Sequence, residues 1–145
     1  MTNLQLRVRD VMTTDLLTVE QNQELGIADA LMQSKRVRHV LVVDDEGSLQ
    51  GVISQRDLFH GGLLKALGYG TRAKQMALET LRAKDAMTAS PLTATPDTAL
   101  SEAARVMADR KIGCLPVVEG NDLVGIVTEG DFVLLFAGRT THSPA

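Results

Sequence analysis

The chain contains the same succession of motifs twice. Residues 10–13, Asp-Val-Met-Thr, return as residues 85–88, Asp-Ala-Met-Thr, and residues 51–57, Gly-Val-Ile-Ser-Gln-Arg-Asp, return as residues 125–131, Gly-Ile-Val-Thr-Glu-Gly-Asp. The first pair is offset by 75 residues and the second by 74, so the second copy is one residue shorter. Self-similarity at a fixed period indicates a repeat architecture.

The length of the chain indicates how the two copies are stabilised. It has 145 residues, of which 44% are hydrophobic and only 3% aromatic, so the interior must consist of aliphatic side chains and methionine. A single copy of about 50 residues would bury too little surface to be stable alone. We therefore expect the copies to share a core and fold as one unit.

Charge and hydropathy exclude several classes of protein. A net charge of −3 gives no broad attraction for nucleic acid or for an anionic membrane, so neither is expected as a partner. The chain has no apolar run of the roughly 20 residues needed to span a bilayer, and no signal-peptide core at its start. Its single cysteine, Cys114, excludes an internal disulfide and fits a reducing compartment. We expect a soluble, cytoplasmic protein.

Hydrophobic spacing predicts the same elements in each copy. Each copy contains apolar residues at helical spacing, which predicts one amphipathic helix per copy: Leu25, Ala28, Leu31 and Met32 in the first, and Leu100, Ala103, Val106 and Met107 in the second. We expect Thr95 to cap the second helix, with Pro96 at its first position. Short β-branched runs then predict two strands per copy, at 40–43 and 52–53 and again at 115–118 and 123–127, each pair followed by a helix. With the short extended pieces at 16–19 and 91–94, the order is strand, helix, strand, strand, helix, twice.

The remaining segments are a connector and a tail. Residues 60–82 join the copies and contain a predicted helix at 71–82, while residues 138–145 are small and polar and are expected to fray.

The pattern Ser/Thr-x-x-Asp follows the last strand of each copy, as Ser54 with Asp57 and as Thr128 with Asp131. It has a structural interpretation, because a hydroxyl at the start of a helix with an acid three residues later forms a capping box. It also has a functional interpretation. The start of a helix attracts phosphate, and a nearby carboxylate accepts hydrogen bonds from ribose hydroxyls. The residues alone leave both interpretations open.

The doubled order of Met-Thr, strand, amphipathic helix, Leu115-Pro116-Val117-Val118 and Gly-x-x-Thr-x-x-Asp resembles the CBS domain. The resemblance covers residues 8–59 and 83–137, as repeats one and two. It implies an α/β (α+β) fold of two tandem β-α-β-β-α repeats, packed about a pseudo-twofold axis as one CBS-pair module. It further implies two clefts that hold AMP, ADP, ATP or a related adenosine derivative, and a regulatory role.

Carried over position by position, the resemblance makes Asp57 and Asp131 the ribose ligands and places Ser54 and Thr128 near phosphate. A ligand can draw residues from both copies, and the sequence does not assign them to one cleft. The complete set of candidate ligand-binding residues is Thr13, Asp15, Leu16, Leu17, Val37, Arg38, His39, Ser54, Arg56, Asp57, Thr88, Ser90, Pro91, Leu92, Ile112, Gly113, Cys114, Pro116, Thr128, Gly130 and Asp131.

The two copies differ in charge at corresponding positions of this set. The first copy offers cationic or titratable side chains that suit phosphate, whereas the second has small, uncharged ones. The differing residues are Arg38, His39 and Arg56 in the first copy and Gly113, Cys114 and Gly130 in the second. We expect the first copy to supply most phosphate contacts.

Other functions have less support in the sequence. The histidines and Cys114 lack metal-ligand spacing, and no activated nucleophile is recognisable, so we predict neither a metal site nor an enzyme, and no required cofactor. Cys114 is interpreted as a buried hydrophobe in preference to a redox thiol. The alternative to nucleotide sensing is a dimerisation or partner-docking module that uses apolar surfaces at 63–67 and 133–136. The resemblance to CBS-domain pairs, which often form homodimers, implies a homodimer, and a regulated protein partner is left unspecified.

Overall fold

The computed structural model describes residues 5–60 and 71–138. The chain divides into two compact units. The first-copy unit is Leu17–Pro91, and the second-copy unit joins Leu92–Ala145 to Met1–Leu16 from the other end of the chain. The boundaries predicted from the repeats, 8–59 and 83–137, follow the sequence motifs and remain a prediction.

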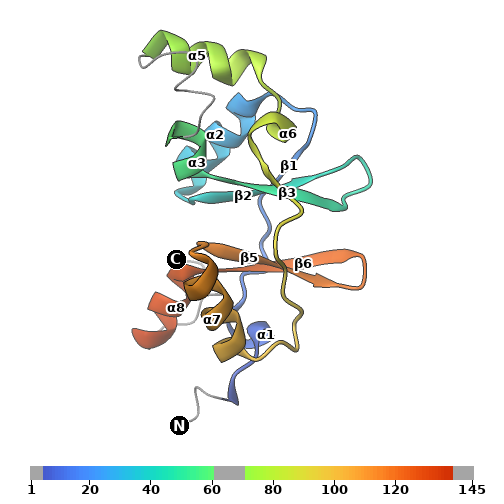
Figure 1. Cartoon of the computed structure of the whole chain (residues 1–145), viewed down its shortest axis with the longest axis vertical. Coiled ribbons are helices and arrows are strands. Elements are labelled where there is room, and N and C mark those ends of the chain that lie inside the picture. The colour runs from blue at the N-terminus through green and yellow to red at the C-terminus, as the bar shows by residue number, and fades with distance from the viewer. Residues whose placement is uncertain (1–4, 61–70, 139–145) are drawn as a thin grey trace. The chain divides into compact units, whose positions relative to one another are not determined.

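The first-copy unit is a four-stranded sheet with the order β1-β2-β3-β4. The β1–β2 pair is parallel and the other two pairs are antiparallel. Helices α2 and α3 lie over one face of the β2–β3 hairpin, and α5 contacts α2 (Figure 1). The elements are β1 (Thr18–Glu20), α2 (Leu25–Lys35), β2 (His39–Val43), β3 (Leu49–Ser54), α3 (Gln55–His60), α5 (Thr71–Thr80), α6 (Ala83–Ala86) and β4 (Thr88–Ala89).

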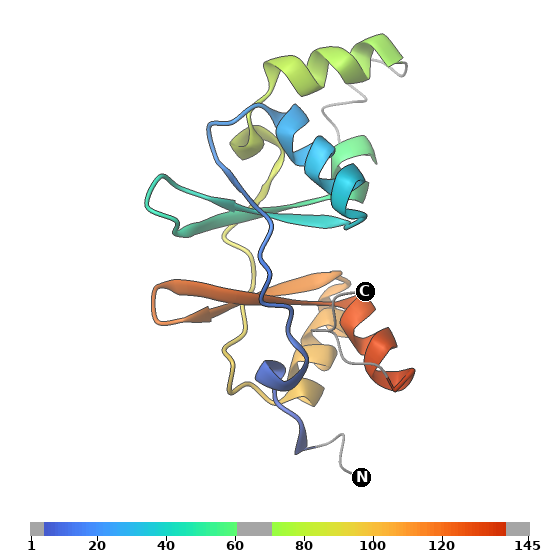
Figure 2. The ribbon, with the colours of Figure 1, turned by 180° about the vertical axis from the view of Figure 1, so that it is seen from behind.

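The second-copy unit repeats this plan around the antiparallel β5–β6 hairpin. Single bridges stand where the first-copy unit has its edge strands: Ala94 pairs with Val117 in parallel, and Thr13 pairs with Ile126 in antiparallel. Helices α1, α7 and α8 lie over one face of the hairpin, as the view from behind also shows (Figure 2). The elements are α1 (Val8–Val11), α7 (Leu100–Arg110), β5 (Cys114–Glu119), β6 (Asp122–Thr128) and α8 (Glu129–Phe136).

Each unit is completed by the Met-Thr segment of the other copy. Thr88 pairs with Val52 in the first-copy unit, and Thr13 pairs with Ile126 in the second-copy unit. The repeated glycine lies directly beneath this segment. A Cβ atom at Gly125 would lie 2.8 Å from the Met12 sulfur, and one at Gly51 would lie 2.7 Å from the carbonyl oxygen of Thr88. In both units, therefore, the repeated Met-Thr segment and the repeated glycine lie in close contact with each other.

Among the described residues, the buried hydrophobic side chains form two clusters, one in each unit, and the expectation of a single core shared by the copies stays a prediction. Each cluster combines a hairpin and a long helix of one copy with a short helix of the other. The exchanged segments supply the apolar surface that a single copy of this size lacks. The exchanged residues in these clusters are Val8 and Val11 of α1 and Ala83 of α6, none more than 4% exposed.

The predicted fold class is confirmed, and each copy has the predicted long helix, hairpin and closing helix, whereas α1, α6 and β4 were not predicted and the start of α7 was placed wrongly. Helix α7 begins at Leu100 after Ala99, instead of at Pro96 after Thr95. Thr95 and Thr98 form a separate turn, in which the Thr95 N–H donates to the Thr98 hydroxyl at 3.0 Å and the Thr98 N–H donates to the Thr95 carbonyl at 3.1 Å. Thr95 and Thr98 thus form hydrogen bonds with each other and do not cap the helix.

Four further predictions concern the connector, the tail, the extended piece at 91–94 and the packing of the repeats. The connector helix is present as α5, whereas residues 61–70 of the connector and residues 139–145 of the tail lie outside the described residues. Of the extended piece at 91–94, only Ala94 makes a strand-type bridge. Packing about a pseudo-twofold axis stays a prediction.

Candidate functional site

In the first-copy unit, the candidate residues meet at one end of the β2–β3 hairpin. His39 opens β2 and pairs with Ser54, which closes β3. The Gln55 N–H donates to the Arg38 carbonyl at 2.8 Å, which joins the residue before the hairpin to the residue after it. The Arg38 and Arg56 side chains are exposed at this end, and those of His39 and Ser54 are half-buried. This end of the sheet therefore presents two guanidinium groups to solvent.

The second-copy unit has the same geometry with different chemistry. Cys114 pairs with Thr128 across β5 and β6, and the Glu129 N–H donates to the Gly113 carbonyl at 3.1 Å. Gly113 and Gly130 occupy the places of the two arginines, and exposed Glu129 occupies that of Gln55. The cationic end of the first-copy unit thus corresponds to an anionic end here.

Asp131 is buried at the start of α8, with 4% of its surface exposed. Its Oδ2 accepts a hydrogen bond from the Thr128 N–H at 2.8 Å, which is the helix-capping contact predicted for the motif. Its Oδ1 accepts one from the Thr13 hydroxyl at 3.2 Å. Thr13 and Asp131, both predicted as ligand-binding residues, are therefore hydrogen-bonded to each other. Asp57 lies in α3, and its side chain is outside the described part of the structure.

The Met-Thr segments reach the hairpins of the opposite copies. Residues 13–16 lie in the second-copy unit, and Leu17 begins the first-copy unit. Residues 88–91 lie in the first-copy unit, and Leu92 begins the second-copy unit. Each candidate site thus mixes residues of the two repeats, as the sequence left open. Ser90 has a positive φ of 49° and is exposed, which is uncommon for a residue other than glycine.

Val37 and Ile112 occupy corresponding places just after the long helices. Both are half-buried, and their N–H groups donate to Met32 and Met107 carbonyls, each at 3.1 Å. These bonds close the ends of α2 and α7 and fix where the chain turns toward β2 and β5. The two residues therefore set the position of the neighbouring Arg38 and Gly113.

Cys114 and Pro116 are buried in β5. Burial raises the pKa of the Cys114 thiol from 9.0 to about 12, so the thiolate is scarce at neutral pH. This supports the interpretation of Cys114 as a small buried hydrophobe. Pro116 offers its carbonyl to the Ala94 N–H at 2.9 Å.

The sequence interpretation missed two residues at these ends, Gln55 and Glu129. Each directly follows the Ser or Thr of the motif, and its N–H closes the hairpin end. The sequence shows that one of them is charged and the other is not, but it does not show that both lie where the two strands of a hairpin end side by side.

Among the described residues, no group of three or more His, Cys, Asp or Glu is placed to hold a metal ion. The same part of the chain has no helix long and apolar enough to cross a membrane.

Comparison with protein families decides the relationship. The model of the CBS domain matches residues 8–62 and again residues 83–138. The chain belongs to the CBS domain family. This CBS-domain chain is 32% identical over 127 residues to the CBS domain-containing protein YhcV of Bacillus subtilis, covering 88% of the chain and 83% of YhcV. It is 31% identical over 140 residues to the uncharacterized protein MJ1404 of Methanocaldococcus jannaschii, covering 90% of the chain but 32% of that longer relative.

Solved structures show the same fold. The structure of CBSX2 in complex with AMP has a TM-score of 0.74 and 31% identity, covering 91% of this chain and 96% of that one. The CBS domain pair of MJ0100, in complex with 5'-methylthioadenosine and S-adenosyl-L-methionine, has a TM-score of 0.73 and 27% identity, covering 92% and 97%. CBS-pair proteins with this fold therefore include binders of adenosine derivatives.

Proposed function

We propose that the chain is a regulatory module that binds an adenosine nucleotide or a related adenosine derivative at the helix-start ends of its two hairpins. One observation carries this proposal: in each copy, the Ser/Thr-x-x-Asp motif contacts the residue before the hairpin. The contacts are the backbone hydrogen bonds from Gln55 to Arg38 and from Glu129 to Gly113. The complexes of CBSX2 with AMP and of MJ0100 with two adenosine derivatives support the ligand class. The module needs no cofactor and performs no catalysis. It acts on a protein partner in a cytoplasmic setting.

The two ends suit different ligands. At the first-copy end, exposed Arg38 and Arg56 favour a phosphate group through charge-assisted hydrogen bonds. At the second-copy end, Glu129 and Asp131 repel phosphate and favour a neutral or cationic group. AMP, ADP or ATP would therefore occupy the first-copy end in preference, and a ligand such as S-adenosylmethionine the second.

Titration calorimetry tests this proposal. The purified chain is titrated with AMP, ADP, ATP and S-adenosylmethionine, alongside Arg56→Gly and Glu129→Gln variants, each of which replaces a charged residue with its uncharged counterpart from the other copy. We expect Arg56→Gly to weaken nucleotide binding and leave S-adenosylmethionine binding unchanged, and Glu129→Gln to do the reverse. No heat of binding with any of the four at millimolar concentration would refute the proposal.

A second candidate function is association of two copies of this chain through α8. Phe132 and Leu135 of this helix pack against the core, whereas Val133 is 67% and Phe136 84% exposed. Exposed aromatic and branched side chains on one helix are typical of contact surfaces. The apolar residues at 63–67, also predicted as a contact surface, lie outside the described residues.

Light scattering distinguishes this association from a monomeric sensor. We expect a dimer mass at micromolar concentration and a monomer mass for Phe136→Glu. A monomer mass for the unmodified chain would refute the homodimer. A dimer that no adenosine derivative stabilises against heat would favour the docking function over ligand sensing.

A further inference from the structure

The N-terminal residues 6–13, which we call the strap, close the second-copy unit. The Val8 N–H donates to the Thr98 carbonyl at 2.9 Å, and the Leu100 N–H donates to the Leu6 carbonyl at 2.8 Å. Val8 and Val11 are 0% and 4% exposed and belong to the same hydrophobic cluster as α7. The first part of the strap is therefore anchored by both backbone bonds and buried side chains.

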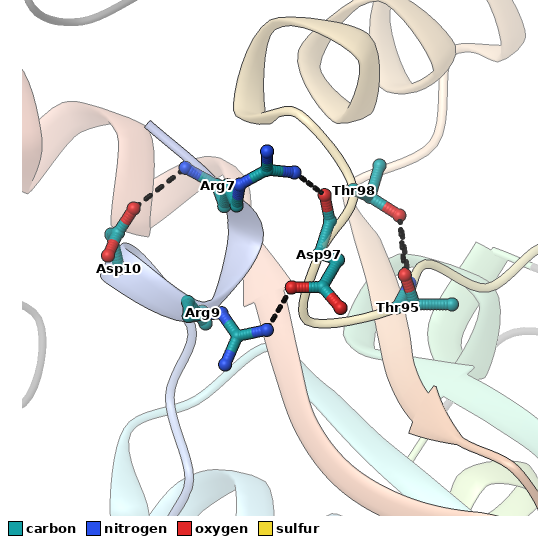
Figure 3. A network of polar contacts seen from close by, with 6 residues as sticks. All are labelled: Arg7, Arg9, Asp10, Thr95, Asp97 and Thr98. Carbon is teal, nitrogen blue, oxygen red and sulfur yellow. Dashed lines mark hydrogen bonds and ion pairs between the residues drawn. The ribbon is translucent and has the colours of Figure 1, made fainter. Parts of the chain in front are cut away.

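Charged side chains reinforce this anchor on the outer surface. Arg9 forms an ion pair with the Asp97 carboxylate, and the Arg7 guanidinium donates to the Asp97 carbonyl. Figure 3 shows Arg7, which precedes α1, and Arg9, within α1, pointing toward the Thr95–Thr98 turn that precedes α7. The Arg7 N–H donates to the Asp10 carboxylate at 2.8 Å, which fixes the start of α1 itself.

The last residue of the strap, Thr13, is attached differently. Its N–H and carbonyl form a pair of hydrogen bonds with Ile126, at 2.9 and 3.0 Å, and its hydroxyl donates to Asp131 Oδ1 at 3.2 Å. Thr13 is thus the point at which the strap touches the candidate ribose ligand. The hydroxyl bond joins residues 118 positions apart in the chain.

Both oxygens of the Asp131 carboxylate already accept a hydrogen bond, and the residue is almost completely buried. Each carboxylate oxygen has a second lone pair, but with only 4% of Asp131 exposed, a ribose hydroxyl that donates to it must enter the space that these donors already occupy. The bond from the Thr128 N–H is fixed by the start of α8. The Thr13 hydroxyl, in contrast, rotates about one side-chain bond and can turn away. Of these two bonds, the Thr13 bond is the one that a ligand can replace at lower cost.

We infer that the Thr13 hydroxyl and a ligand's ribose compete for Asp131, so that ligand binding at the second-copy end releases the end of the strap. This inference rests on the proposed function and adds its regulation. Thermodynamic linkage makes the effect reciprocal: the strap bond lowers ligand affinity by the same factor by which the ligand weakens the strap bond. Thr13 then acts as a competitor of the ligand, in contrast to its prediction from the sequence as a ligand contact.

Calorimetry with three variants tests the competition. All are made in an Arg38→Ala/Arg56→Ala background, which weakens the first-copy end, and adenosine and S-adenosylmethionine are the probes. Thr13→Val keeps the shape and removes the donor, and we expect it to bind about 3- to 10-fold more tightly, the scale of one ordinary net hydrogen bond. Thr13→Ser restores the hydroxyl and should return the affinity to that of the background. Thr18→Val, an exposed threonine of β1 in the other unit, is the control and should change nothing.

Hydrogen exchange on the unmodified chain gives a second readout that needs no variant. Saturating ligand should accelerate hydrogen exchange of the Thr13 amide about threefold or more, because loss of the Thr13–Asp131 hydroxyl bond loosens the backbone hydrogen bonds between Thr13 and Ile126. Exchange of the Val8 amide should stay unchanged. Slower exchange at Thr13, or weaker binding by Thr13→Val, would show that Thr13 contacts the ligand and would overturn the inference while keeping the proposed function. Absence of binding by the unmodified chain would remove both.

Discussion

Replacement of Gly125 by alanine tests the exchange of Met-Thr segments between the two copies, which brings Met12 of the first copy into the second-copy unit. The structure places the Met12 sulfur 2.8 Å and the Thr13 carbonyl oxygen 3.1 Å from the position of an added Cβ. Favourable contacts between carbon and its neighbours lie near 3.5–4.0 Å, so both atoms must move away. Gly125 does not have a positive φ, so alanine itself fits the backbone there and the cost arises from these contacts.

The magnitude follows from which atoms can yield. The sulfur belongs to a flexible side chain, but the Thr13 carbonyl is held by the Ile126 N–H at 3.0 Å. Overpacking of this kind costs about 1–3 kcal/mol, and the loss of glycine's freedom in the unfolded chain returns up to about 1 kcal/mol. We therefore expect Gly125→Ala to lower the free energy of unfolding by about 1–2 kcal/mol.

A double-mutant cycle with Met12→Ala isolates the contact. Urea denaturation is measured for the unmodified chain, both single variants and the double variant. Removal of the sulfur relieves the closer of the two contacts, so the double variant should be about 1 kcal/mol more stable than the sum of the single effects predicts. Additivity within about 0.5 kcal/mol would mean that residues 12 and 125 do not touch, and would refute the exchange.

Gly130→Ala is the matched control for this cycle. A Cβ at Gly130 would meet only the Thr128 hydroxyl oxygen at 3.5 Å, an ordinary contact, and the residue lies in the first turn of α8. Alanine has a higher helix propensity than glycine by about 1 kcal/mol. The substitution should therefore leave stability unchanged or raise it.

Three further predictions concern stability. Arg36 and Lys111 follow α2 and α7 with a φ of 55°, so replacing either with glycine should raise the free energy of unfolding by about 0.5–1 kcal/mol, and an unchanged urea midpoint would contradict this. Burial raises the pKa of the Cys114 thiol from 9.0 to about 12, so between these two pH values the thiol stays protonated in the folded chain and ionises in the unfolded chain. This difference should lower the free energy of unfolding by about 1.4 kcal/mol per pH unit in that range. Cys114→Ala should remove that slope. Asp97→Ala should cost less than about 1 kcal/mol, because Arg9 and Asp97 are 49% and 70% exposed, and a larger loss in urea denaturation would assign the pair a greater role.

The sequence predicted the elements well because their signals are local. Helical spacing after Leu25 and Leu100 and the β-branched runs of the hairpins each depend on a few neighbouring residues. The wrong start of α7 has a local cause too: Thr95 carries a capping signal, but its partner is the Thr98 turn.

The tertiary contacts of the candidate site could not be obtained in this way. The Thr13–Asp131 bond joins residues 118 positions apart, and no periodicity indicates which sheet a short Met-Thr segment joins. The repeat offered one clue, since Met-Thr and the strand glycine recur together and contact each other. In the same way, the opposite charges of Arg56 and Glu129 gain meaning only once the hairpin ends are paired.

Amide chemical-shift mapping tests the central claim, that adenosine derivatives bind at the helix-start ends of the hairpins, most directly. The labelled chain is titrated with AMP and, separately, with S-adenosylmethionine. AMP should shift the amides of Arg38, Gln55 and Arg56 most, and S-adenosylmethionine those of Gly113, Glu129 and Asp131. Saturable shifts confined to other parts of the chain, or no shifts at millimolar ligand, would contradict the claim.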